Sequence, residues 1–112
     1  MKKIEAIIRP EKLEHVRQAL EKVGCSGLMI SEIEGHGKQK GVVQQWRGEK
    51  YKVELVPKIK IEIVAKDMEV EPITKTIIEN AKTNEVGDGK IFIWDIGNAI
   101  RIRTGEKGEQ AL

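Results

Sequence analysis

The sequence lacks the features that mark several common classes of protein. One cysteine, Cys25, is present, which excludes a disulfide within the chain. No run of apolar residues approaches the roughly 20 that a membrane-spanning helix needs. The first residues show no apolar segment followed by a cleavage site, as a secretory signal would have. We therefore expect a reduced protein of the cytoplasm, which would reach a membrane only through a partner.

An excess of charge of one sign is also missing. The 112 residues include 20 Lys and Arg against 18 Asp and Glu, a net charge of +2. Such a balance creates no broad electrostatic field that would attract nucleic acid or acidic lipid. Any cationic binding site must therefore be local. The length suits a single compact domain that spans residues 1–112.

Groups for hydrolytic catalysis are scarce. The histidines are His15 and His36, and no serine or cysteine has an evident base partner in the sequence. We interpret Cys25 as a buried apolar filler. Asp88 and Glu62 could act as bases or assist a metal, but a turn and a charged strand face explain them more simply. The residues thus indicate a binding protein and not an enzyme.

Hydrophobic periodicity, in contrast, is clear along most of the chain. Alternating or β-rich stretches predict strands at residues 3–9, 27–35, 58–63 and 90–96. Apolar residues spaced by three and four predict helices at residues 11–23 and 69–81, the second of them capped by Asp67. We expect the strand at 90–96 to be buried on both faces and residues 99–104 to form a short edge strand.

An internal repeat supports this order of elements. The tripeptide Lys-Ile-Glu at residues 3–5 recurs at residues 60–62, an offset of 57, and the apolar positions of the two helices keep the same offset. Two βαβ halves predict an α+β fold, a ferredoxin-like βαββαβ sandwich with a long loop between strands 2 and 3. Right-handed crossovers would place both helices on one face of the sheet, which leaves the other face for another subunit to cover. We therefore expect an oligomer.

The long loop in this scheme comprises about residues 36–54. Its 19 residues contain little that builds a core, and connections in compact domains usually have about 4–6 residues. Trp46 and Tyr51, among glycines and long polar side chains, suit an arm that docks on a partner. A hairpin extension whose Trp46 packs back on the core is the alternative, and the composition leaves both open.

A candidate anion site lies where the second helix meets the last strand, in a turn at about residues 83–90. Gly87, Asp88 and Gly89 precede Lys90, and glycines there can direct several backbone N–H groups at one anion. Taken alone, such a segment is often only a turn. It matches neither the phosphate loop of the common nucleotide-binding folds nor the dinucleotide fingerprint.

Two arginines follow in a C-terminal segment at about residues 99–106. Arg101 and Arg103 alternate with isoleucines, which would place both guanidinium groups on one strand face, where they could bind phosphate oxygens. A solvated edge would show the same pattern. Because the glycine turn, Lys90 and both arginines lie within 17 residues, their combination favours a polyphosphate ligand.

Five separated blocks of the sequence together resemble the PII nitrogen-regulatory family. In order they are MKKIEAIIRP at residues 1–10, GHGKQKG at 35–41, PKIKIEIV at 57–64, GDGKIF at 87–92 and IRIRTGE at 100–106. The resemblance extends over nearly the whole chain. It implies a ferredoxin-like homotrimer that binds ATP or ADP in the clefts between neighbouring subunits.

The resemblance also implies roles for individual residues. The ATP or ADP site would comprise Ile7, Gly35, Gly37, Lys38, Gln39, Glu62, Val64, Gly87, Asp88, Gly89, Lys90, Arg101 and Arg103. Of these, Ile7, Glu62 and Val64 would line the adenine base of the nucleotide. The effector 2-oxoglutarate would bind beside a magnesium ion held by the nucleotide phosphates, with Gln39 as a metal ligand and Lys58 paired with a carboxylate. Binding would fix the base of the long loop in one conformation.

By the same resemblance, the loop would regulate ammonium channels, regulators of glutamine synthetase or nitrogenase-related proteins. Tyr51 is the candidate for nucleotidylylation, but its segment reads WRGEKY where the family usually has Tyr-Arg-Gly-Ala-Glu-Tyr. Glu49 replaces a serine that is phosphorylated in some members. Met29 replaces a threonine that usually contacts the adenine, and Asn84 replaces a glycine in the turn before Gly87.

Two other functions fit the same fold class. One is a nucleotide- or RNA-binding module without 2-oxoglutarate sensing, although Phe92 and Trp94 lack the flanking signature of RNA-binding strands. The other is a small acylphosphatase-like enzyme, which would depend on Arg101. The balanced charge and the scarcity of catalytic groups make both less favoured than the sensor.

Overall fold

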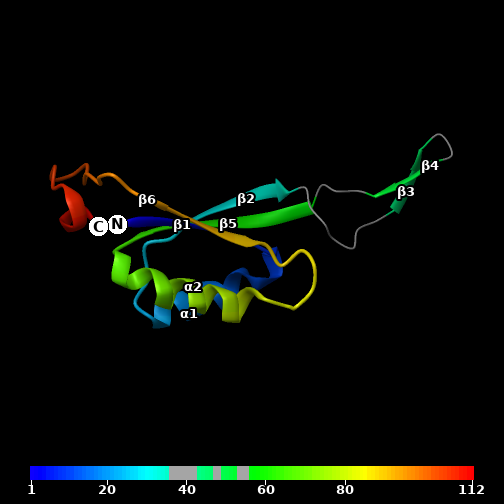
Figure 1. The fold of residues 1–112 in the computed structure, drawn as a ribbon, viewed down its shortest axis with the longest axis horizontal. Helices are drawn as coiled ribbons and strands as arrows, with labels where there is room; N and C mark the ends of the chain where they lie inside the picture. Colours follow the sequence, from blue (N-terminus) through cyan, green and yellow to red (C-terminus); the bar gives the residue numbers. More distant parts are fainter. Residues whose placement is uncertain (36–42, 47–48, 53–55) are drawn as a thin grey trace.

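The computed structural model describes residues 1–35, 43–46, 49–52 and 56–112. Figure 1 shows the order of the elements along the chain. They are β1 (Lys2–Ile8), the 3-10 helix η1 (Pro10–Lys12), α1 (Leu13–Lys22), β2 (Met29–Gly35), β3 (Val43–Trp46), β4 (Glu49–Lys52), β5 (Val56–Ala65), α2 (Asp67–Ala81), β6 (Lys90–Asp95) and the 3-10 helix η2 (Gly108–Ala111). Among the described residues, no helix has the length and apolarity to cross a membrane.

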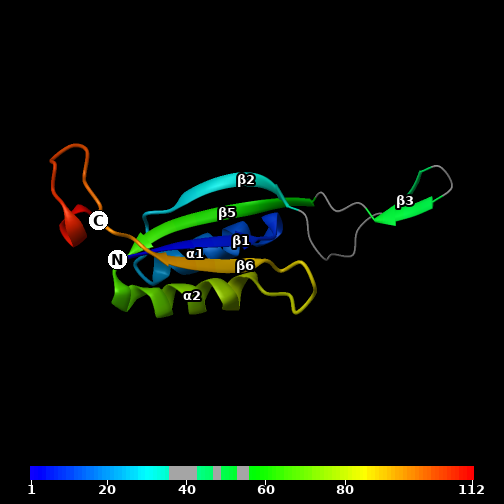
Figure 2. The same cartoon turned by 45° about the horizontal axis from the view of Figure 1, so that its top comes forward.

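Within these residues, β2, β5, β1 and β6 form one antiparallel sheet, in that order. β1 lies in the interior, where Ile4 is opposite Ile63 of β5 and Ile93 of β6. Figures 1 and 2 show both helices on the same side of this sheet. The arrangement confirms the expected α+β, ferredoxin-like βαββαβ fold, whereas the homotrimer stays a prediction.

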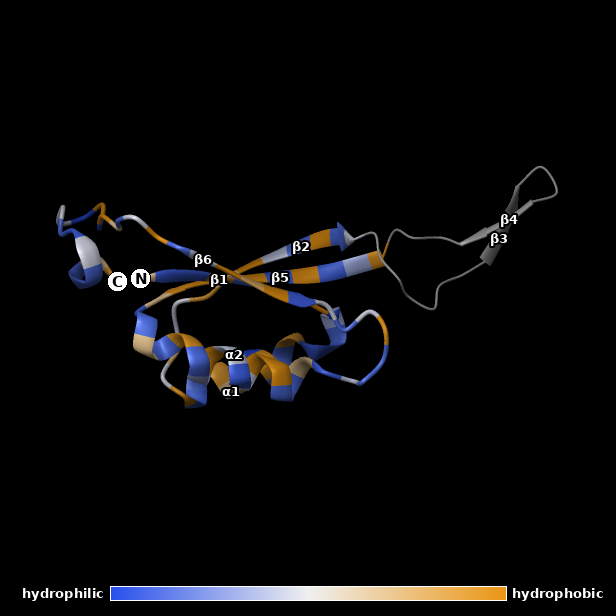
Figure 3. Cartoon of the chain, viewed as in Figure 1, coloured by the Kyte–Doolittle hydropathy of each residue, from blue (hydrophilic) through white to orange (hydrophobic). Residues whose placement is uncertain are grey.

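The core lies between the sheet and the helices. Alternation directs every second side chain of β1 and β5 toward the helices, whose apolar residues recur every three or four positions. Figure 3 shows the alternation as bands of colour along β5. Burying each large aliphatic side chain contributes about 1.5–3 kcal/mol relative to exposure. The buried apolar residues are Ile4, Ala6, Ile8, Val16, Leu20, Ile59, Ile61, Ile63, Ala65, Ile73, Ile77 and Ala81.

α2 begins at Asp67, two residues before the predicted start at residue 69, and its N-cap differs from the prediction by one residue. Lys66, not Asp67, is the N-cap, and the Glu69 carboxylate accepts a hydrogen bond from the Lys66 backbone N–H at 3.0 Å. Asp67 is the first helical residue, and its carboxylate pairs with the α-amino group of Met1 at 2.9 Å. A carboxylate is favoured at the N-cap and also in the first turn, where it complements the helix dipole. An Asp in the sequence therefore marks the start of a helix only to within a residue or so.

The expectation that β6 is buried on both faces is wrong for the single chain. Phe92, Ile93 and Trp94 are 48%, 46% and 43% exposed. β6 is an edge strand, and only Ile91 of this strand packs against the core. An apolar run indicates that a strand is to be covered, but it does not indicate which chain covers it.

Residues 99–104 do not form the expected edge strand. Ile100 makes one bridge with Lys107, residues 102–104 form a turn, and the Gly105 N–H donates to the Arg101 carbonyl at 2.7 Å. Gly105 has a φ of 74°, which glycine adopts without steric cost. The chain therefore reverses after Arg103, and we call the resulting segment, residues 99–112, the C-terminal lobe.

Part of the long loop is a hairpin. β3 pairs with β4 in antiparallel register, from Val43 opposite Lys52 to Trp46 opposite Glu49. Figure 1 shows this hairpin beyond the ends of β2 and β5, away from both helices. The side chain of Trp46 lies outside the described ones, so both alternatives, docking on a partner and packing on the core, stay open. The other loop residues, 36–42, 47–48 and 53–54, also lie outside the described part of the chain, as does residue 55.

Candidate functional site

The predicted anion site is a tight turn between α2 and β6, residues 83–89, which we call the phosphate turn. Its backbone has positive φ angles at Asn84 (67°), Gly87 (104°) and Gly89 (100°). A Cβ atom at Gly89 would lie 1.7 Å from the backbone oxygen of Ile7, so no other residue fits there without moving β1. The turn is thus seated directly on the end of β1.

The Asp88 carboxylate organises the phosphate turn from inside. It accepts hydrogen bonds from the Thr83 N–H (2.7 Å), the Thr83 hydroxyl (2.5 Å), the Asn84 N–H (2.9 Å) and the Arg9 Nε (3.0 Å). Burial alone would raise the pKa of this carboxyl, but the hydrogen bonds outweigh burial and hold the pKa far below its usual value. Because the side chain is committed to the turn, Asp88 can offer an anion only its backbone N–H.

Two cationic side chains, those of Arg9 and Lys58, donate hydrogen bonds to backbone carbonyls of the turn. Arg9, just after β1, donates from Nη2 to the Val86 carbonyl at 2.9 Å. Lys58 of β5 donates from Nζ to the Gly87 carbonyl at 2.5 Å and is only 8% exposed. Burial and the neighbouring Arg9 lower the pKa of the Lys58 ammonium. Nothing in the sequence near Arg9 indicates this role, because its partners lie 77 and 79 residues away.

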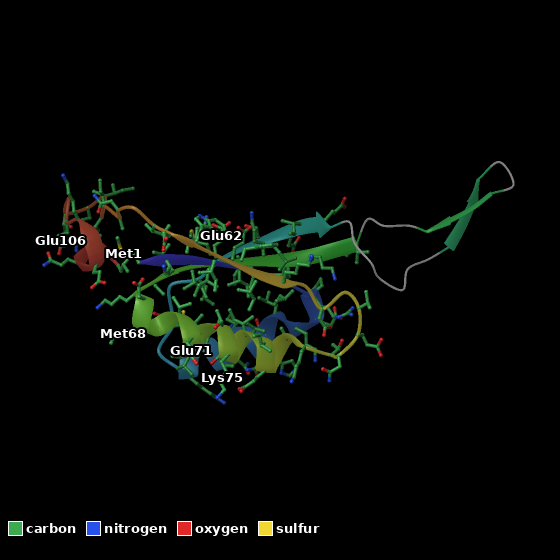
Figure 4. All side chains as sticks on the ribbon, viewed as in Figure 1. Met1, Glu62, Met68, Glu71, Lys75 and Glu106 are labelled. Carbon is green, nitrogen blue, oxygen red and sulfur yellow. The ribbon has the colours of Figure 1, made fainter. Side chains whose placement is uncertain are left out.

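The side chains of Ile7, Glu62 and Val64 lie on the sheet face opposite the helices, which we call the open face. Figure 4 shows Glu62 on that side. Glu62 pairs with Lys3 at 3.2 Å and Lys60 at 3.3 Å, and hydrogen bonds from both lower the pKa of its carboxyl. Ile7 is opposite Lys60 and Val64 is opposite Lys3 in the pairing of β1 with β5. The three residues predicted to contact the adenine therefore lie at different heights along these two strands.

The predicted arginine pair lies at the other end of the sheet. Arg101 pairs with Glu106 at 2.7 Å and donates to the carbonyls of Gln110 (3.1 Å) and Leu112 (3.3 Å). Figure 2 shows the C-terminal lobe and the phosphate turn at opposite ends of β6. A single chain therefore does not bring Arg101 and Arg103 to the phosphate turn. Their placement on one strand face is also wrong, because Arg103 lies in a turn.

The remaining predicted residues lie near the base of the long loop. Gly35 ends β2, and a Cβ atom there would be 3.3 Å from Cγ of Lys58. Gly37, Lys38 and Gln39 are outside the described residues, as is the side chain of Tyr51. Lys90 begins β6, next to the turn. In the described part of the chain, no group of three or more His, Cys, Asp or Glu is placed to hold a metal ion.

A pocket of about 250 Å³ lies beside the phosphate turn. It lies between α2 and the strands β1 and β6, close to the phosphate turn. Five of its ten lining residues are isoleucines, among them Ile78 of α2 and Ile91 of β6, and Asp88 and Lys90 also line it. The pocket is apolar where it meets α2, so the polar groups of the site are concentrated in the turn.

Comparison with known proteins gives one consistent result. The family model described as nitrogen regulatory protein P-II matches residues 1–106. The chain is 50% identical over 112 residues to nitrogen regulatory protein P-II 2 of Methanothermobacter thermautotrophicus, covering 100% of this chain and 97% of that protein. It is 49% identical to nitrogen regulatory protein P-II of Pasteurella multocida and 50% identical to nitrogen regulatory protein P-II 1 of Escherichia coli strain K12, covering 100% of each chain.

Proposed function

The chain belongs to the nitrogen regulatory protein P-II family, and from this membership we propose that it senses ATP or ADP together with 2-oxoglutarate. It is a signalling protein of nitrogen metabolism and not an enzyme. The observation that supports nucleotide sensing is the phosphate turn, where Gly87 and Gly89 have positive φ and two cations of the sheet lie beside the backbone. Backbone N–H groups in such turns form concave anion sites.

A complete site requires more than one copy of the chain. The phosphate turn and Arg101 lie at opposite ends of β6, so the arginines that bind the phosphates would come from a neighbouring subunit. Contacts of this head-to-tail kind close into rings, and a homotrimer would contain three equivalent sites. The open face and the exposed residues of β6 are available to be covered in such an assembly.

The effector would bind next to the nucleotide. Lys58 lies between Gly35, at the base of the loop, and Gly87, and its ammonium could pair with a carboxylate of 2-oxoglutarate. A magnesium ion would be held by the nucleotide phosphates, the oxoacid and Gln39, because hard cations prefer oxygen ligands. The ion would draw the base of the loop toward the nucleotide.

The loop would carry the signal to a partner. The β3–β4 hairpin lies away from the core, where it could contact an ammonium channel, a regulator of glutamine synthetase or a nitrogenase-related protein. In this scheme the protein works in the cytoplasm, reaches a membrane only through a partner and binds no nucleic acid. Since coupling between sites is reciprocal, a partner that selects the ADP form would weaken 2-oxoglutarate binding by the same factor.

Calorimetry tests the proposed sensing directly. We expect heat on adding ATP, and heat from 2-oxoglutarate only when ATP and magnesium are present. Replacing Gln39 by Ala should abolish the response to 2-oxoglutarate and leave ATP binding intact. Binding of the oxoacid without nucleotide, or equal loss of both ligands in the variant, would show that the assignment is wrong.

A further inference from the structure

Three consecutive residues of the phosphate turn, Val86 to Asp88, are held by the side chains of Arg9, just after β1, and Lys58 of β5. Arg9 contacts the Val86 carbonyl through Nη2 (2.9 Å) and the Asp88 carboxylate through Nε (3.0 Å). Lys58 contacts the Gly87 carbonyl through Nζ at 2.5 Å. Both side chains are largely buried, with 14% of Arg9 exposed and 8% of Lys58. We call this arrangement the grip.

The grip fixes the direction of two backbone N–H groups. In a planar trans peptide, the carbonyl of one residue and the N–H of the next point in opposite directions. The Val86 carbonyl points at Arg9, so the N–H of Gly87 points away from it. The Gly87 carbonyl points at Lys58, so the N–H of Asp88 points away from that ammonium. Two adjacent donors therefore point away from the cations, each fixed by a contact on the opposite side of its own peptide.

From this geometry we propose that Arg9 and Lys58 are positioning residues, which present the N–H groups of Gly87 and Asp88 to the phosphates of a nucleotide. The inference rests on the nucleotide binding proposed above. In this proposal Lys58 acts in nucleotide binding even when no oxoacid is present. Asp88 contacts the nucleotide through its backbone N–H and not through its side chain.

The rest of the turn fits this role. The Asp88 carboxylate binds Thr83, Asn84 and Arg9, which holds its negative charge on the Arg9 side of the turn, the side from which the Gly87 N–H points away. The same carboxylate accepts the N–H groups of Thr83 and Asn84, so it also closes the first half of the turn. Donors fixed before the ligand arrives lose less conformational entropy on binding, and this raises affinity.

The test compares variants of the full-length chain in ATP titrations without 2-oxoglutarate. Arg9→Gln and Lys58→Gln each remove one cation of the grip, and each should weaken ATP binding about tenfold, because the carbonyl that the cation holds would be free to turn and its peptide N–H would lose its fixed direction. Arg9→Lys keeps the charge but cannot make both contacts, so it should bind ATP with intermediate affinity. Arg17→Gln is the matched control, because Arg17 pairs with Glu14 on the surface of α1 and should leave ATP binding unchanged.

Nuclear magnetic resonance supplies a readout that a merely structural role would not change. In the wild-type chain, the amide signals of Gly87 and Asp88 should shift downfield on addition of ATP. In folded Arg9→Gln at saturating ATP, these two shifts should shrink while the shift of Val64 persists. This comparison needs no oxoacid and remains informative if one variant is unstable, because the wild-type signals and Arg9→Lys still report.

The outcomes separate the two proposals. If the wild-type chain binds no ATP, the proposed function fails and this inference fails with it. If the wild type binds ATP but the grip variants bind it equally well, or if the Gly87 and Asp88 signals do not move, only the grip is wrong. Weakened binding in both Gln variants, with unchanged binding in the control, supports it.

Discussion

The two ends of the sheet are held together in different ways. The phosphate turn depends on residues distant in sequence, because the grip comes from Arg9, just after β1, and Lys58 of β5, and Gly89 is seated against β1. The C-terminal lobe depends mainly on its own residues, such as the pair of Arg101 and Glu106 at 2.7 Å, and its Ile102 is fully exposed. The contacts of the phosphate turn are therefore made within one chain, while the lobe leaves an apolar side chain exposed in the single chain.

The largest expected effect tests how tightly the turn is seated. Gly89→Ala places a Cβ atom 1.7 Å from a β1 carbonyl at a φ of 100°, and it should destabilise the fold by about 3 kcal/mol or more. Gly105→Ala in the lobe, with φ 74° and open space around it, should cost about 1–2 kcal/mol. Urea unfolding at one protein concentration measures both, and equal losses would mean that the two ends are seated alike.

The next effect concerns the exposed lobe. Ile102 is 101% exposed in the single chain, so Ile102→Ser should leave the fold of the chain intact. If a neighbour buries this side chain, the change should weaken assembly by about 2 kcal/mol per contact, visible by sedimentation. Met68→Ser, at a residue 81% exposed on α2, is the control and should sediment as the wild type does. Unchanged assembly in the Ile102 variant would remove the lobe from the interface.

A smaller effect should depend on pH. The pKa of Asp88 is lowered in the folded chain, so the folded state binds fewer protons there than the unfolded state. The stabilisation is complete well above the unfolded pKa of about 3.9 and is lost as the pH falls toward the folded pKa. Asp88→Asn should cost about 1–2 kcal/mol at neutral pH, and the gap to the wild type should narrow below about pH 4. A gap that stays constant down to pH 2 would contradict this account.

The smallest effect is expected from the ion pair of the lobe. Arg101 and Glu106 are 35% and 40% exposed, and pairs at such positions contribute about 0.2–1 kcal/mol. Glu106→Gln should therefore lower the free energy of unfolding by less than about 1 kcal/mol. High salt should reduce the difference further, and thermal unfolding at two ionic strengths checks this. A loss as large as that of Asp88→Asn would show that both ends rely on electrostatics equally.

The fold was predictable because its core is periodic. The alternation around Ile4 and Ile61 and the helical spacing around Val16 and Ile77 come from residues that are all buried in one core. Such patterns record which side of an element is covered, and that information is local. The order of elements, and with it the ferredoxin-like fold, could therefore be inferred without knowing any contact.

The candidate site was only partly predictable, because much of it depends on contacts between distant residues. The glycines of the phosphate turn were found from composition, but Arg9 was not, since nothing near it in sequence points to Val86. The alternation around Arg101 suggested a strand, yet the turn closed by Gly105 overrides it. The β6 run was misread for another reason: its cover would have to come from a second chain.

The position of Lys58 limits how such a sequence can change. Its stem passes 3.3 Å from where a Cβ atom of residue 35 would be, and its tip is bonded to the Gly87 carbonyl. A larger residue at position 35 would push on the stem, and a shorter one at position 58 would release the carbonyl. The base of the long loop and the phosphate turn therefore cannot be redesigned separately, and a protein engineer who grafts a new loop onto this scaffold should keep Gly35 and Lys58 together.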